Sequence, residues 1–91
     1  MDISLQINLQ SLALCQIKQK SLESLRNLIN LTVINVAGNQ ITSIEPLRNL
    51  SRIQQLNLSQ NKLWCDLELL VLKNMPRLCE LDLSGNKLLV C

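Results

Sequence analysis

The stretch LTVINVAGNQI, residues 31–41, recurs as IQQLNLSQNKL at residues 53–63 and as LCELDLSGNKL at residues 78–88. All three copies fit the pattern L-x-x-L-x-L-x-x-N-x-L when Ile or Val is allowed at the leucine positions. The asparagine of the pattern returns after 22 residues and then after 25 residues. A motif that returns in this way predicts a stacked array in which each unit packs on its neighbours.

An earlier copy of the pattern is present in degenerate form. Residues 9–17, LQSLALCQI, keep the leucine spacing, but Ile17 stands where the asparagine belongs. Terminal units of a repeat array commonly depart from the consensus. The preceding residues 3–9 alternate apolar and polar side chains. We therefore expect an additional strand that covers the first repeat, or a still earlier degenerate repeat.

The centre of each motif predicts a short strand with one buried face, because apolar and polar residues alternate there. Parallel stacking of such strands would place the motif leucines in columns. The asparagine follows where the chain must leave the strand, and its amide can satisfy backbone groups opened by the bend. We expect a structural ladder rather than a ligand site, formed by Asn39, Asn61 and Asn86.

The segments between the motifs predict short helices or tight helical turns. Apolar residues step by three from Leu22 to Leu31 and from Ile44 to Ile53. Pro46 suits the first turn of a helix, where its missing N–H costs nothing. The last connecting segment has three additional residues, and we expect an α-helix there over 67–74.

Two residues near this insertion carry separate expectations. Asp66 precedes the expected helix and is a good N-cap residue, while Pro76 should follow its end. Trp64 is the only aromatic residue of the chain. We expect it to fill the space that the insertion opens; the alternative is an exposed anchor for a binding partner.

Composition excludes several classes of function. Hydrophobic residues make up 47% of the 91 residues, the net charge is only +2, and the basic residues are spread out. Nucleic-acid binding is not expected, because it needs clustered Lys and Arg. The matching positions Arg26, Arg48 and Lys73 indicate a solvated outer face rather than a basic binding stripe. No apolar run is long enough for a membrane span, and the polar N-terminus does not resemble a signal peptide, so we expect a cytoplasmic protein.

The cysteines favour free thiols over a metal site. Cys15, Cys65, Cys79 and Cys91 form no Cys-x-x-Cys pair, and the chain has no His. Zinc is therefore not expected, and neither is any other cofactor. Disulfides are the alternative, and they would indicate an extracellular protein. Three N-x-S/T sequons begin at Asn30, Asn49 and Asn57, and we interpret them as unmodified.

The motif, with the L-x-x-L segments between its copies, resembles the leucine-rich repeats of the protein phosphatase 1 regulatory subunit class. Residues 31–63 carry the likeness best, and it extends over most of 9–88. Similar repeats occur in axonemal dynein light chain, in ciliary assembly proteins and in the spliceosomal A-prime protein. The resemblance implies a curved solenoid whose parallel strands line the concave side, where family members grip protein partners. It also allows a ciliary, cytoskeletal or nuclear location.

The predicted fold is α/β: one leucine-rich-repeat solenoid over 1–91, with about four repeats. Short parallel strands should line its concave side and helical turns its convex side. Residues 1–20 form an N-terminal strand and the degenerate repeat, and residues 21–63 form two regular repeats. Residues 64–91 form the repeat with the insertion and a C-terminal end without a polar cap. We expect a fragment, or an end covered by a partner or by self-association.

The candidate binding residues are those that flank the motif leucines and face outward from the strands. They are Val33, Asn35, Gln55, Asn57, Glu80 and Asp82. We do not expect an enzyme: two carboxylates, Glu80 and Asp82, suggest acid–base chemistry, but no His stands near them in the sequence. The predicted function is a scaffold or regulatory module for a protein partner. Alternatives are an extracellular recognition fragment and the repeat region of a longer multidomain protein.

Overall fold

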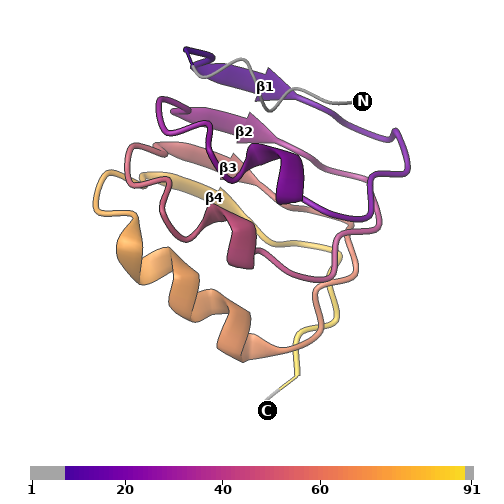
Figure 1. Cartoon of the computed structure of the whole chain (residues 1–91). Helices are drawn as coiled ribbons and strands as arrows, with labels where there is room; N and C mark the ends of the chain where they lie inside the picture. Colours follow the sequence, from indigo (N-terminus) through magenta and orange to yellow (C-terminus); the bar gives the residue numbers. More distant parts are fainter. Residues whose placement is uncertain (1–7, 90–91) are drawn as a thin grey trace.

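The computed structural model describes residues 8–89, apart from the side chains of residues 66–68. The expected strand over 3–9 therefore lies almost wholly outside the described residues. Four three-residue strands stack in sequence order into one parallel sheet (Figure 1). Their bounds are β1 Ser11–Ala13, β2 Val33–Asn35, β3 Gln55–Asn57 and β4 Glu80–Asp82. The predicted fold, a leucine-rich-repeat solenoid of short parallel strands, is confirmed.

The sheet register stacks equivalent motif positions on one another. Leu12 lies beside Ile34, Ile34 beside Leu56, and Leu56 beside Leu81. Repetition of the motif makes every strand bury the same side chain, so a shift of one residue would expose an entire column of leucines. The buried face packs against the connecting segments, which lie on one side of the sheet (Figure 1).

The first two connecting segments contain short 3-10 helices, η1 Glu23–Leu25 and η2 Glu45–Leu47. A 3-10 helix has three residues per turn, so residues three apart lie on one line. Pro46 lies in the first turn of η2, as expected. The apolar residues that step by three are all buried in the core: Leu22, Leu25, Leu28, Leu31, Ile44, Leu47, Leu50 and Ile53.

The third connecting segment, η3 Asp66–Asn74, corrects the prediction of an α-helix, because it is a nine-residue 3-10 helix. Cys65, not Asp66, is the N-cap. The backbone N–H of Met75 donates to the carbonyl of Leu72 at 3.1 Å, and that of Leu78 donates to Met75 at 3.1 Å. Leu72, Met75 and Leu78 are three residues apart and all pack on the core. An α-helix, with 3.6 residues per turn, would rotate some of these side chains away from the core.

The asparagines of the motif join neighbouring repeats. The side-chain oxygen of Asn39 accepts from the N–H of Gln19 at 2.9 Å, and its amide donates to the carbonyl of Leu14 at 2.6 Å. The amide of Asn86 donates to the carbonyl of Leu58 at 2.9 Å in the preceding repeat. Asn39 and Asn61 are buried polar residues, yet no buried side-chain nitrogen or oxygen among the described residues lacks a partner.

The two ends of the sheet are less covered than its centre. Leu56 in β3 is 2% exposed, whereas Leu81, its neighbour in β4, is 41% exposed. The apolar face of β4 is thus partly open, while β3 is covered on both sides. Leu89 joins Cys65 in an isolated parallel bridge at this end. Within residues 8–89, no helix has the length and apolar character needed to cross a membrane.

The cysteines differ from the expectation of four free thiols. Cys15 and Cys79 are free and exposed, but Cys65 is disulfide-bonded. Cys91 lies outside the described residues. Cys65 lies just before η3. The spacing of the four cysteines in the sequence does not show that this cysteine, rather than Cys15 or Cys79, forms a disulfide.

Candidate functional site

The outward-facing strand residues form the floor of an open hollow on the sheet. The hollow has a volume of about 450 Å³ and is lined by β2, β3 and β4. All six predicted binding residues lie in its lining: Val33, Asn35, Gln55, Asn57, Glu80 and Asp82. Their shared location follows from the sequence, because the strand period puts alternate residues on one face.

The six residues form two rows across the strands. Val33, Gln55 and Glu80 are register partners in the first row. Gln55 and Glu80 are exposed and Val33 is half-buried. Among the described residues, the Gln55 and Glu80 side chains form no hydrogen bond. This row therefore offers side chains that can adapt to a bound surface.

The second row, Asn35, Asn57 and Asp82, has a structural role that the sequence analysis did not assign. Each side-chain oxygen accepts a hydrogen bond from the backbone N–H two residues later, at 3.2, 2.9 and 2.9 Å respectively. Asx residues form such local bonds readily. The signal was visible as Asn or Asp at the same position of three repeats. These side chains hold the strand ends and line the hollow at the same time.

The hollow is acidic at its β4 side. Glu80 and Asp82 are both exposed there, whereas the β2 and β3 residues that line the hollow are uncharged. The Ser84 hydroxyl donates to the Asp82 carboxylate at 2.7 Å, and the Ser84 N–H donates to it as well. These bonds stabilise the ionised carboxylate and lower the pKa of Asp82 below its ordinary value.

Trp64 corrects the expectation that it fills the insertion, because its residue surface is 57% exposed. Leu72 from η3 and Met75, which follows its end, pack against the core instead. Trp64 lines a second, separate hollow together with Lys62 and Lys87. The sequence did not reveal this hollow, because it forms only where the third repeat lies beside the fourth.

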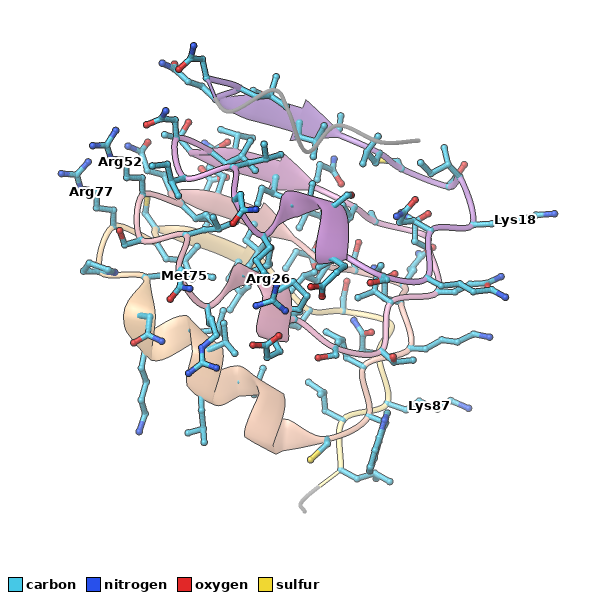
Figure 2. The ribbon with its side chains drawn as sticks, in the orientation of Figure 1. Lys18, Arg26, Arg52, Met75, Arg77 and Lys87 are labelled. Atoms are coloured by element: carbon cyan, nitrogen blue, oxygen red, sulfur yellow. The ribbon has the colours of Figure 1, made fainter. Side chains whose placement is uncertain are left out.

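The outer legs carry paired charges. Arg26 lies 2.7 Å from Glu23 and 2.6 Å from Glu45, and Arg48 lies 3.3 Å from Glu45. Hydrogen bonds from Arg26 are the main cause that lowers the pKa of both Glu23 and Glu45. Figure 2 places Arg26 on the helical side of the sheet, between the connecting segments. The arrangement matches a solvated, charge-balanced outer face.

The first hollow has the geometry of a broad, open surface on the sheet. The first hollow is a wide depression with polar walls, and its two carboxylates lie on one strand. Among the side chains that the structure describes, which leave out those of residues 66–68, no group of three or more His, Cys, Asp or Glu could hold a metal ion. A parallel solenoid of this kind defines a class of proteins whose repeats build extended binding surfaces.

Comparison with known families agrees with this class. The family described as leucine-rich repeats (2 copies) matches residues 29–74. This chain belongs to the leucine-rich repeat family. Leucine-rich repeat domains generally mediate protein–protein interaction. No curated protein sequence matches the chain significantly.

Solved structures show the same architecture. An internalin (inlF) from Listeria monocytogenes superposes with a TM-score of 0.88 at 30% identity, over 94% of this chain and 24% of that one. Internalin C2 from the same organism gives a TM-score of 0.89 at 29% identity, over 96% of this chain and 37% of that one. The chain thus spans only 24% and 37% of the lengths of these two similar structures.

Proposed function

We propose that this chain is a protein-interaction module that holds a segment of a partner protein against β2, β3 and β4. The observation that carries the proposal is the 450 Å³ hollow, whose lining includes Val33, Gln55 and Glu80 in one continuous row. A row of adaptable side chains beside a half-buried apolar residue supplies both shape and polar contact. The role is that of a scaffold or regulatory subunit without catalysis.

The charge of the hollow limits the partner. Glu80 and Asp82 place two carboxylates at one end of an otherwise uncharged floor. Opposite charge steers encounter and sets the orientation of a bound segment. We infer that the segment carries a Lys or Arg at the end that meets β4 and uncharged residues where it crosses β2.

A cross-linking experiment tests the proposal. A photoreactive residue at Gln55 should capture a partner in cells, whereas the same residue at Asn49 on the convex side should not. The purified partner should then bind Gln55→Arg/Glu80→Arg more than tenfold more weakly, because the variant adds bulk and reverses charge at the centre of the surface. These side chains hold no turn in place, so circular dichroism should show an intact fold. Equal affinity of the variant and the original chain would refute the concave-face proposal.

A second candidate function, extracellular recognition, is favoured by one observation. Cys65 is disulfide-bonded, and disulfides persist in oxidising compartments. The cytoplasmic location expected from the sequence requires reduced cysteines. Thiol titration separates the two proposals when the protein is isolated from cells without reductant and then denatured. Four reactive thiols would support a cytoplasmic location, and two would support an extracellular or otherwise oxidising location.

We also propose that the open face of β4 supports self-association. Leu81 is 41% exposed and Leu70 in η3 is 52% exposed, so an apolar surface remains beside the last strand. An unpaired strand edge next to such a surface can add a further strand. The alternative, a continuing repeat of a longer chain, would cover the same residues.

A further inference from the structure

A second hollow lies at the edge where the chain leaves β3 and β4. Its volume is about 330 Å³, and we call it the Trp64 hollow. It shares no lining residue with the first hollow, which lies on β2, β3 and β4. Its lining consists of Asn61, Lys62, Leu63, Trp64, Gly85 and Lys87. Figure 2 shows Lys87 reaching outward at this edge, with Lys18 of the first repeat reaching outward farther along it.

The backbone that carries Trp64 is held on both sides. The N–H of Leu63 donates to the side-chain oxygen of Asn86 at 3.0 Å, and the N–H of Leu89 donates to the carbonyl of Trp64 at 2.7 Å. Leu63 itself is fully buried. The Trp64 residue is nevertheless more than half exposed. A large apolar ring on a fixed backbone loses little freedom when a ligand packs against it.

Two lysines flank this ring at equivalent repeat positions. Lys62 and Lys87 each follow a ladder asparagine, in the turns that come after the neighbouring strands β3 and β4, and both line the hollow with Trp64. Ion pairs among the described residues involve only Glu23, Arg26, Glu45 and Arg48. Neither lysine forms an ion pair with a described side chain, so two uncompensated lysines line the hollow beside one exposed tryptophan.

We propose that the Trp64 hollow binds an acidic segment of a partner protein, in which a large aliphatic side chain is flanked by carboxylates. The aliphatic side chain packs on the indole of Trp64, and the carboxylates pair with the ammonium groups of Lys62 and Lys87. A small inorganic anion would make no apolar contact with the indole, and an uncharged apolar segment would form no ion pair with either lysine. This site goes beyond the concave-face function and does not depend on it.

The single tryptophan allows a direct measurement. The chain has one Trp and no Tyr or Phe, so its fluorescence reports this hollow alone. The probe is a short synthetic peptide with Leu at its centre and Glu on both sides. We expect it to shift the Trp64 emission to shorter wavelength and to protect the indole from iodide. Matched peptides with Gln for Glu, or with Ser for Leu, should cause little change.

Lysine variants test the charge requirement. Lys62→Gln/Lys87→Gln should weaken binding of the acidic peptide roughly fivefold, because two exposed ion pairs are lost. Lys18→Gln/Lys20→Gln removes the same charge from the first repeat and should bind as the original chain does. In the free protein, the ratio of iodide quenching to quenching by neutral acrylamide should be raised by the local positive charge. This ratio should fall in Lys62→Gln/Lys87→Gln and stay unchanged in Lys18→Gln/Lys20→Gln.

Several outcomes would overturn the proposal. One is equal weakening by both double variants, which would show a general charge effect. Another is equal binding of the Gln-containing peptide. A third is a Trp64 response to phosphatidylserine vesicles without a response to the acidic peptide, which would assign the hollow to a membrane surface. The quenching measurement needs no ligand, so it still decides the electrostatic part if the variants bind weakly.

Discussion

The side-chain oxygen of Asn61 accepts a hydrogen bond at 3.0 Å from the backbone N–H of Ile41, twenty residues earlier in the chain. The amide of Asn61 donates to the carbonyls of Val36 and Leu58, each at 3.0 Å. One buried side chain therefore connects the turn of the second repeat to the end of β3. Each repeat depends on the asparagine of the next to satisfy its backbone.

Asn61→Ala should lower the free energy of unfolding by roughly 3 kcal/mol, because it leaves several buried backbone groups without partners. Asn86→Ala should cost less, since Asn86 is only half-buried and lies at the open end. Urea denaturation followed by circular dichroism measures both. A loss at position 61 no greater than that at position 86 would contradict the ladder as a main source of stability.

The residue before each motif asparagine has a positive φ, and glutamine and glycine alternate there. An added Cβ at Gly38 would lie 2.7 Å from Cγ of Gln16, and one at Gly85 would lie 2.9 Å from Cγ of Gln60 and 3.2 Å from its backbone Cα and N. Gly38→Ala and Gly85→Ala should each destabilise by about 1–2 kcal/mol from the left-handed backbone alone.

The two glycines should differ in rescue. Gln16→Ala removes the Cγ that meets position 38, so it should recover part of the stability lost in Gly38→Ala. Gln60→Ala leaves its backbone close to position 85 and should recover less. Double-mutant cycles of thermal unfolding check this difference. Equal coupling in the two cycles would show that side-chain contact is not the cause.

Acid should weaken the outer face. The pKa values of Glu23 and Glu45 lie below the ordinary value of 4.5, chiefly through hydrogen bonds from Arg26. A carboxyl group whose pKa is lower in the folded than in the unfolded protein stabilises the folded protein at pH values above its unfolded-state pKa. That stabilisation disappears as pH falls through the folded-state pKa. The melting temperature should therefore drop between pH 5 and pH 3 by less in Arg26→Met than in the original chain. Arg52→Met is the control, because Arg52 donates to the amide oxygen of Asn30 instead of a carboxylate. An acid-induced drop of the same size in Arg26→Met and the original chain would exclude the network as its source.

Leu56 and Leu81 occupy the same motif position but should contribute unequally to the free energy of unfolding. Leu56→Ala should cost roughly 2–5 kcal/mol, as expected when a fully buried leucine leaves a cavity. Leu81→Ala should cost much less, because Leu81 is 41% exposed at the β4 edge. Urea midpoints at low protein concentration measure this without association. Equal losses would mean that another surface covers Leu81 in solution.

Self-association through β4 should be visible by light scattering. Leu81→Lys should shift the protein toward the monomer, because a lysine would have to be desolvated in the contact. Ile29→Lys is a matched control, since Ile29 is 58% exposed on a different part of the surface. A protein that remains monomeric at high concentration before any substitution would end the self-association proposal.

The motif by itself determined the strands, their parallel order and the face of each residue. Apolar and polar residues alternate around Ile34, Leu56 and Leu81, so only one face of each strand can bury the apolar side chains. Because the motif repeats, the same register holds from strand to strand. The concave placement of Gln55 and Glu80 follows from the same alternation. The step of three from Ile44 to Ile53 likewise indicated the tight helical turns.

Only the tertiary structure decided how η3 winds and where Trp64 points. The intrinsic helix preference of residues 67–74 favours an α-helix, but the core accepts one apolar residue in every three and selects the 3-10 form. With Leu72 and Met75 on the core, Trp64 stays at the surface. Leu56 and Leu81 occupy the same motif position, yet only one is buried, because burial depends on whether a further unit packs on that side. Local pattern thus defines each unit, whereas exposure and binding surfaces arise from the neighbours that each unit has.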